Sequence, residues 1–122
     1  MNAPLPVFET FVERYVSVWN EADPEASRAL IAALWVPGGA NFTRSLEHRG
    51  YAALETRVRA SREKWVRDGG CFFRPRHAQS HHGAAHIEWE MLSLEGEVKS
   101  IGRELLLLAP DGRIESDWQF VP

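Results

Sequence analysis

Two acidic residues near the end of the chain have the type and spacing of an acid–base pair. Pro110-Asp111-Gly112 is a turn signal, because proline presets φ and glycine tolerates a positive φ. A four-residue hairpin loop there pairs Leu108 with Arg113. Counting back along both arms, Glu104 then lies opposite Asp117 on the same face of the sheet. Two carboxylates about 5 Å apart raise the pKa of one of them, which suits proton transfer. The alternative is that both acids point into water.

The elements that must position these acids begin with helices. Apolar residues recur at i, i+3, i+4 and i+7 over residues 8–19, which is one face of an α-helix. Asp23-Pro24-Glu25 has the residue types of an N-cap and first turn, and we expect this second helix to end at Pro37-Gly38-Gly39. A short extended segment is expected over residues 40–46, and a third helix over residues 51–67.

The second half of the chain has the alternation of β-strands. Strands are predicted over residues 71–79 and 84–92, and the hairpin described above follows over residues 101–121. Helices followed by antiparallel strands indicate an α+β fold. A curved sheet folded over the helices would enclose a pocket between the two layers.

Size and composition limit the function classes. With 122 residues, 44% hydrophobic and 25% charged, residues 1–122 are expected to form a single domain. The net charge of −3 and the lack of a basic tail argue against nucleic acid as a partner. No apolar run is long enough to span a bilayer, so a membrane partner is not expected. Cys71 is the only cysteine, which favours the reducing cytoplasm and a buried, inert thiol.

Other polar residues are interpreted as solvated. His82 and His86 share a strand face but lie about 13 Å apart, so a metal site is not expected. The third helix mixes basic and acidic residues, which indicates a solvent face. These residues are Arg57, Arg59, Arg62, Lys64 and Arg67, with Glu55, Glu63 and Asp68 between them.

Four short motifs, in this order, resemble the nuclear transport factor 2-like superfamily, particularly its SnoaL-like and ketosteroid-isomerase-like branches. They are residues 12–20, Leu34-Trp35, residues 48–54 and residues 111–114. The resemblance covers nearly the whole chain. It implies a cone-shaped α+β fold, with three N-terminal helices packed on a strongly curved, mainly antiparallel sheet that encloses a pocket. Because this fold hosts both enzymes and non-catalytic modules, it does not decide the activity.

The resemblance also implies roles for individual residues. Tyr15 and Glu104 match the tyrosine and the protonated acid that stabilise a dienolate in the isomerases. Thr43 stands where those enzymes carry an aspartate base, and threonine cannot accept a proton from carbon at neutral pH. Asp117 is the candidate replacement, as in SnoaL-like polyketide cyclases, which use an acid–base aspartate without metal or cofactor. We therefore expect Asp117 as the base, Tyr15 and Glu104 as hydrogen-bond donors, and no cofactor.

The expected ligand is a small apolar molecule held by aromatic and polar side chains. Trp19 lies one helical turn beyond Tyr15, and Gln119 has the strand parity of Asp117. The full set of expected contacts is Trp19, Trp35, Phe42, Thr43, Ile87, Trp89 and Gln119. Two functions fit. One is a cofactor-independent enzyme of isomerase, cyclase or lyase type acting on a cyclic or polyketide-like carbonyl compound. The other is a dimeric module that binds a hydrophobic molecule without transforming it.

The last strand has a second set of residues with the opposite parity. Ile114, Trp118 and Phe120 are apolar, and they are either the buried set, which would leave Asp117 in solvent, or part of a homodimer interface. A homodimer is what the resemblance implies, because dimers are common in this superfamily.

Overall fold

The computed structural model describes residues 4–122, and side chains from residue 7 onward. The helical segments are α1 (Pro4–Val18), α2 (Pro24–Leu34) and α3 (Tyr51–Ser61), which continues as a π-helical segment, η1 (Arg62–Arg67). Two strands lie between α2 and α3 in the chain. The side chain of Asp23 accepts a hydrogen bond from the Ala26 amide at 2.9 Å, so the predicted N-cap of α2 is confirmed.

The strands form one sheet with the order β2-β1-β6-β5-β4-β3. The six strands are β1 (Trp35–Phe42), β2 (Glu47–Arg49), β3 (Cys71–His81), β4 (Ala84–Ser93), β5 (Val98–Leu108) and β6 (Ile114–Phe120). All neighbours are antiparallel except β1 and β6, which pair in parallel. The sheet is therefore mixed, and the predicted α+β class with a mainly antiparallel, curved sheet is confirmed.

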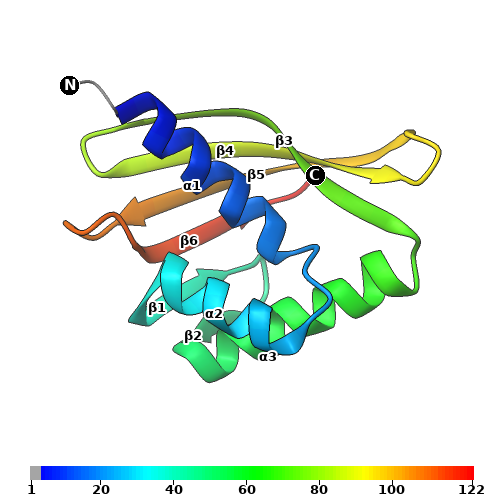
Figure 1. The fold of residues 1–122 in the computed structure, drawn as a ribbon, viewed down its shortest axis with the longest axis horizontal. Coiled ribbons are helices and arrows are strands. Elements are labelled where there is room, and N and C mark those ends of the chain that lie inside the picture. The colour runs from blue at the N-terminus through cyan, green and yellow to red at the C-terminus, as the bar shows by residue number, and fades with distance from the viewer. Residues whose placement is uncertain (1–3) are drawn as a thin grey trace.

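The helices lie against one face of this sheet (Figure 1). The core between the two layers joins α1, α2 and α3 to β1, β4, β5 and β6. Its largest fully buried apolar side chains are Trp35, Tyr15, Ile31, Leu54, Ile87, Leu106 and Ile114. The end of α1 is fixed to β3 by Asn20, whose side-chain amide donates to the Phe73 carbonyl and accepts from the Phe73 amide, both at 2.8 Å. The position of α1 over the sheet is therefore set at both its face and its end.

The largest departure from the sequence prediction is around Pro37. The second helix ends at Leu34 rather than at Pro37, and β1 begins at once with Trp35 instead of residue 40. Pairing with β6 is interrupted between Trp35 and Ala40, because Pro37 has no amide hydrogen and bulges out of the ladder. Gly39 permits this close approach, since a Cβ there would lie 2.9 Å from the Ile114 carbonyl oxygen.

The third predicted helix is confirmed over residues 51–67, but its last six residues are π-helical. The wider turn is uncommon and is found most often at functional sites. Here it forms the end of the helical wall that faces the pocket described below.

A cross-strand pair on the inner face links the sheet to the pocket. Trp89 on β4 pairs with Gly102 on β5, and the indole lies across the glycine. A Cβ at Gly102 would come within 2.1 Å of the Trp89 ring, so only glycine accommodates this packing. The Phe73 ring meets the indole edge-on, with centroids 5.4 Å apart.

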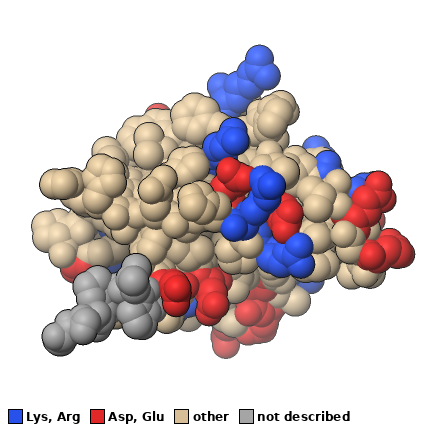
Figure 2. Space-filling view, turned by 90° about the horizontal axis from the view of Figure 1, so that it is seen from above, with Lys and Arg blue, Asp and Glu red and all other residues tan. Residues whose placement is uncertain are grey.

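The outer face of the sheet is divided between charged and apolar residues. Arg74 pairs with Glu90 at 2.6 Å, and Glu88 lies between Arg76 and Arg103. Beyond Arg103, the outward residues on β5 and β6 include the apolar side chains of Leu105, Leu107, Trp118 and Phe120. In the space-filling view, basic and acidic side chains intermingle in one part of the visible face, beside a broad area without charge (Figure 2).

No helix within residues 4–122 is long and apolar enough to cross a membrane.

The Trp89–Gly102 pair gives a stability prediction. Gly102→Ala should lower the free energy of unfolding by about 1–3 kcal/mol, because the new methyl group displaces the indole. Urea unfolding followed by tryptophan fluorescence measures this. Gly38→Ala is the control, since a Cβ there has no atom within 4 Å, and its effect should stay within about 0.5 kcal/mol. Equal effects of the two variants would contradict the packing described.

Candidate active site

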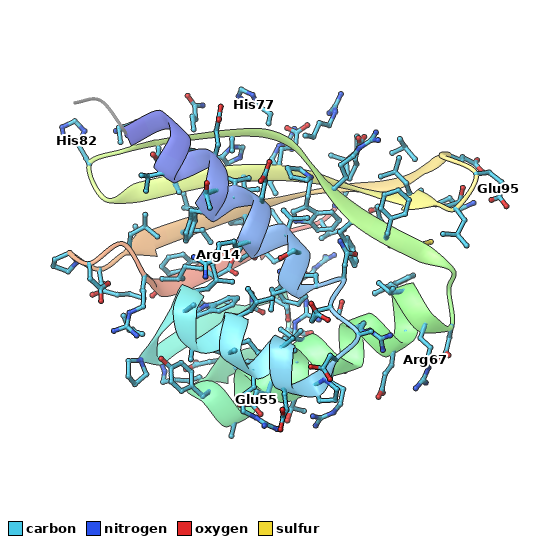
Figure 3. The ribbon with its side chains drawn as sticks, in the orientation of Figure 1. Arg14, Glu55, Arg67, His77, His82 and Glu95 are labelled. Carbon is cyan, nitrogen blue, oxygen red and sulfur yellow. The ribbon has the colours of Figure 1, made fainter. Side chains whose placement is uncertain are left out.

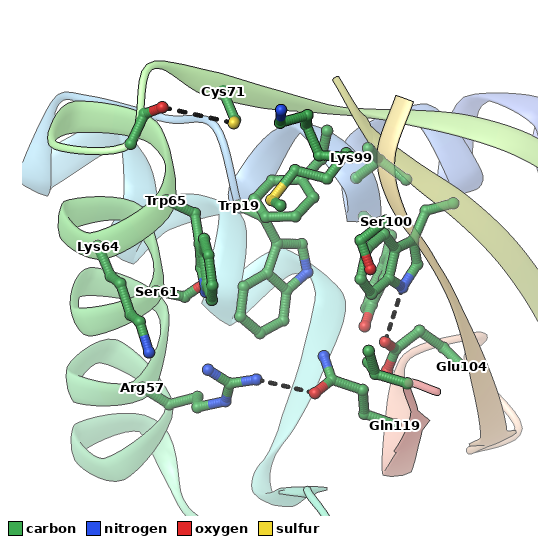
Figure 4. A pocket seen from close by; sticks show the side chains of 17 residues that line it. Trp19, Arg57, Ser61, Lys64, Trp65, Cys71, Lys99, Ser100, Glu104 and Gln119 are labelled. Atoms are coloured by element: carbon green, nitrogen blue, oxygen red, sulfur yellow. Dashed lines mark hydrogen bonds between the residues drawn. The ribbon is translucent and has the colours of Figure 1, made fainter. Parts of the chain in front are cut away.

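A cavity of about 760 Å³ lies between α1, the α3–η1 wall and the inner face of the sheet. This volume lies within the range typical of small-molecule sites. Its walls are mainly aromatic and apolar, and include Trp19, Trp65, Phe73, Trp89 and Met91. Figure 4 shows how these side chains and several polar ones surround it. The polar groups that reach the cavity include Tyr15, Glu104 and Gln119.

A buried carboxyl pair lies at the sheet side of this cavity. The Tyr15 hydroxyl donates a 2.6 Å hydrogen bond to Asp117 Oδ2, and both side chains are buried. The indole nitrogen of Trp89 donates to Glu104 Oε2 at 2.9 Å. The other oxygens, Glu104 Oε1 and Asp117 Oδ1, are buried without a well-formed hydrogen bond to any described residue. A proton held between the two carboxyls would give both of these oxygens a partner.

The two acids share one face of the sheet, but the predicted register is wrong. Leu108 pairs with Ile114 instead of Arg113, and a bulge on β6 then brings Leu107 opposite Ser116. Glu104 therefore lies opposite Gln119, with Asp117 on the diagonal. The loop is longer than predicted, and the bulge adds a further residue. The total shift is two residues, so the parity of the strand is preserved and both acids still face inward.

Burial raises the pKa values of these groups. The pKa of Glu104 lies well above its ordinary value, first because of desolvation and second because of the charge of Asp117. Desolvation also raises the pKa of Asp117, but the neighbouring polar groups of Glu104, Tyr15 and Asn41 and the charge of Arg57 oppose this rise. Burial and the two acids raise the pKa of Tyr15 as well. These shifts favour a proton held within the pair, and the unequal surroundings of the two acids favour its residence on Glu104.

A polar network connects the pair to the helical wall. Arg57 on α3 donates to Asn41 Oδ1 and to Gln119 Oε1, each at 3.3 Å, and its guanidinium lies 5.1 Å from the centre of the Trp19 ring. Asn41 is the register partner of Asp117, and Gln119 that of Glu104. Each carboxyl thus has a neutral amide beside it that Arg57 holds in place.

The structure places the candidate catalytic residues at two depths. Tyr15 and Glu104 line the cavity, whereas Asp117 is enclosed behind them and does not reach it. This placement favours Glu104 over Asp117 as the group that meets a ligand. The single proton of the Tyr15 hydroxyl is donated to Asp117, so in this arrangement Tyr15 supports the carboxylate.

The expected ligand contacts are also divided. Trp19, Trp89 and Gln119 line the cavity. Trp35 and Ile87 do not line it, and both side chains are fully buried in the core between the two layers. Phe42 stacks on Trp118 with ring centroids 5.3 Å apart. Thr43 lies in the turn between β1 and β2, where its hydroxyl accepts from the Leu46 amide at 3.2 Å.

The sequence interpretation missed the contribution of the third helix. Arg57 and Lys64 were assigned to a solvent face, yet both line the cavity together with Trp65. A signal for Arg57 exists, since it lies three residues after buried Leu54 and four before buried Ser61, at the edge of the apolar stripe. Lys64 belongs to the π-helical segment, whose altered periodicity no local pattern predicted.

The remaining candidates lie apart from this site. Figure 3 shows His77 and His82 at the periphery, and the Nδ1 atoms of His82 and His81 lie 3.1 Å apart. Within residues 4–122, no group of three His, Cys, Asp or Glu residues is placed to hold a metal ion. Cys71 is buried in the cavity wall, and its thiol donates to the Gly69 carbonyl at 3.5 Å.

Comparison with solved structures identifies the fold. The chain superposes with a TM-score of 0.83 and 23% identity on a proposed isomerase of the SnoaL-like family from Agrobacterium tumefaciens, over 93% of this chain and 95% of that one. A proposed polyketide cyclase from Sinorhizobium meliloti matches with a TM-score of 0.69 and 14% identity, over 90% and 93% of the two chains. An NTF2-like protein of unknown function from Mesorhizobium loti matches with a TM-score of 0.69 and 16% identity, over 100% and 96%. The chain therefore has the nuclear transport factor 2-like fold, as the sequence resemblance implied.

Comparison of the amino-acid sequence with protein families and curated proteins does not extend this assignment of the fold. No family model matches the chain, and no curated protein matches it.

The raised pKa of Glu104 predicts how stability depends on pH. An unfolded glutamate loses its proton near pH 4.3, whereas the folded protein keeps it to a higher pH. Between these values the free energy of unfolding should fall by up to about 1.4 kcal/mol per pH unit. Glu104→Gln removes this decrease with pH. The free energy of unfolding of the variant, relative to that of the original protein, should therefore rise between pH 5 and pH 8, as measured by urea unfolding at each pH. Glu115→Gln, on the exposed side of β6, should keep the original pH dependence. A constant difference between Glu104→Gln and the original protein would contradict the assignment.

Proposed function

We propose that this protein is a cofactor-independent enzyme that transfers protons on a small apolar carbonyl compound, in an isomerase, cyclase or lyase type of reaction. One observation carries the proposal: a buried carboxyl pair with a raised pKa, one member of which lines an aromatic cavity. The SnoaL-like protein with the best superposition described above is named as a proposed isomerase, which agrees with this choice of chemistry.

Glu104 is the group that exchanges the proton with the ligand. With the shared proton on Glu104, its carboxyl can donate to a carbonyl oxygen. With that proton on Asp117, Glu104 is a carboxylate and can remove a proton from the carbon next to the carbonyl. In an isomerisation Glu104 returns that proton to a second carbon, so no proton is gained or lost overall. A pair with one proton thus supplies both an acid and a base.

The groups around the pair have positioning roles. Trp89 donates to Glu104 and holds its carboxyl in the cavity wall. Tyr15 donates to Asp117, and Asn41 lies directly opposite Asp117 on β1. These donors favour the negative charge on Asp117 and so leave the proton on Glu104 in the resting state.

The alternative is a module that binds a hydrophobic molecule without transforming it. Two placements favour it, because neither residue can act as a base on a ligand in the cavity. Asp117 is fully enclosed, and Thr43 lies in a turn outside the cavity. On this alternative the pair is a structural connection between α1 and the sheet.

Hydrogen exchange at carbon separates the two functions without knowledge of the natural substrate. Cyclic ketones such as decalone and tetralone, in D₂O, should lose hydrogen next to the carbonyl faster with the protein than without it, as followed by NMR. Glu104→Gln should reduce this acceleration about a hundred- to ten-thousandfold while ligand binding persists. The control Glu115→Gln removes a carboxylate outside the cavity and should exchange at the original rate. Binding of the ketones without any accelerated exchange would favour the module.

We also propose that the protein forms a homodimer through the apolar part of the outer sheet face. Leu105, Leu107 and Phe120 are 39%, 42% and 59% exposed there, next to the stacked rings of Phe42 and Trp118. A contiguous exposed apolar area of this kind is typical of an interface.

The test is the mass in solution. Light scattering should give twice the chain mass, and Leu107→Lys should shift the protein toward the monomer, because it buries a charge in the contact. The control is Leu94→Lys, at an exposed position in the β4–β5 turn, which should leave the mass unchanged. A monomeric original protein would exclude the dimer.

A further inference from the structure

The cavity carries positive charge in a protein whose net charge is −3. Arg57, Lys64 and Lys99 line it, and Glu104 is the only carboxylic acid among the described lining residues. The raised pKa of Glu104 favours its neutral form, which does not offset these cations. The polar part of the cavity is therefore suited to a negative group on the ligand.

Arg57 is the cation closest to the chemistry. Its Nε and one terminal nitrogen donate to the neutral oxygens of Asn41 and Gln119, both at the long distance of 3.3 Å. Within the described part of the chain it forms no ion pair, and it acts on Asp117 only through space. The other terminal nitrogen makes no hydrogen bond to a described residue. A planar guanidinium with a free edge in a cavity matches a carboxylate.

Lys64 extends this charge toward the mouth of the cavity. It lies on η1, and its Nζ is 4.7 Å from the centre of the Trp65 ring. No carboxylate of a described residue lies within ion-pair distance of it. Lys99 differs, because it lies on the opposite wall and its Nζ is 3.5 Å from Glu97 Oε1. Figure 4 shows Arg57 and Lys64 on the same helical wall, with Arg57 extending to Gln119.

We infer that the ligand of this cavity is an apolar ring compound with a carboxylate, and that the carboxylate lies against Arg57 with Lys64 behind it. The inference rests on the proposed function in one respect, that the cavity is the ligand site. Gln119 contacts Arg57 and is the register partner of Glu104, so a carboxylate on Arg57 would lie on the same side of the cavity as the atom that exchanges a proton. A cyclic or aromatic oxo acid carries both a carboxylate and a carbonyl group.

The test compares two probes of the same shape, naphthalene-2-carboxylate and naphthalene-2-carboxamide, by calorimetry. The original protein should bind the carboxylate about ten- to a hundredfold more tightly than the amide, with a preference that weakens as salt is added. Arg57→Gln should remove most of this preference and leave the affinity for the amide within about threefold.

Two further variants guard against indirect effects, because Arg57 also holds Asn41 and Gln119. Lys64→Gln touches neither amide and should still lower the preference severalfold. Arg59→Gln removes the same charge from the exposed side of α3 and should leave the preference intact. Equal binding of both probes to the original protein would overturn the inference and leave the proposed function standing. Failure to bind either probe, together with no hydrogen exchange on ketones, would overturn both.

Discussion

The hydrogen bond from the Tyr15 hydroxyl to Asp117 joins the first helix to the last strand at a depth that water does not reach. An ionised carboxylate at that depth is costly unless donors surround it. Tyr15 and the proton shared with Glu104 are those donors, and the Asn41 amide lies beside them. The packing of α1 on the sheet and the protonation of the pair are therefore coupled. A change that moves the helix removes a donor from Asp117, and a change that ionises Glu104 places two charges in one dry space.

The proton on Glu104 follows from unequal surroundings rather than from residue type. Asp117 has a tyrosine, an amide and the field of Arg57, while Glu104 has the Trp89 indole and Gln119. The Trp89 indole reaches Glu104 because Gly102 lets it lie flat against β5. One missing side chain thus sets the geometry of an acid two residues further along the same strand. Residues such as Gly102, which act on a site through the residues that form it, help to set its geometry.

The helical wall contributes the opposite charge. The π-helical turn at the end of α3 brings Lys64 and Trp65 to the cavity, and Arg57 reaches it from the regular part of the helix. The sheet side of the site therefore carries Glu104, whose raised pKa favours its neutral form, and the helix side carries the cations. The aromatic cavity lies between them. Such a separation orients a polar ligand before any chemistry occurs.

The sequence alone predicted whatever depends on local periodicity. The apolar spacing of the first helix, the cap at Asp23 and the turn at Pro110-Asp111-Gly112 all lie where expected. The shared face of Glu104 and Asp117 also follows from the strand pattern, although the pattern left open whether this face meets the core or solvent. It survived an incorrect register only because the loop and the bulge together added an even number of residues.

Depth and contact were decided by the tertiary structure. Strand alternation assigns a face, but it cannot say that Asp117 is enclosed while Glu104 reaches the cavity, or that Trp35 fills the core. These outcomes depend on the early start of β1 at the Pro37 bulge and on where α3 crosses the sheet, which are contacts between residues far apart in the chain. Arg57 has the residue type of a surface charge and lies at the edge of the apolar stripe, and its long-range partners Asn41 and Gln119 place it in the site. A local pattern determines which way a side chain points, whereas the packing of distant elements determines what it meets.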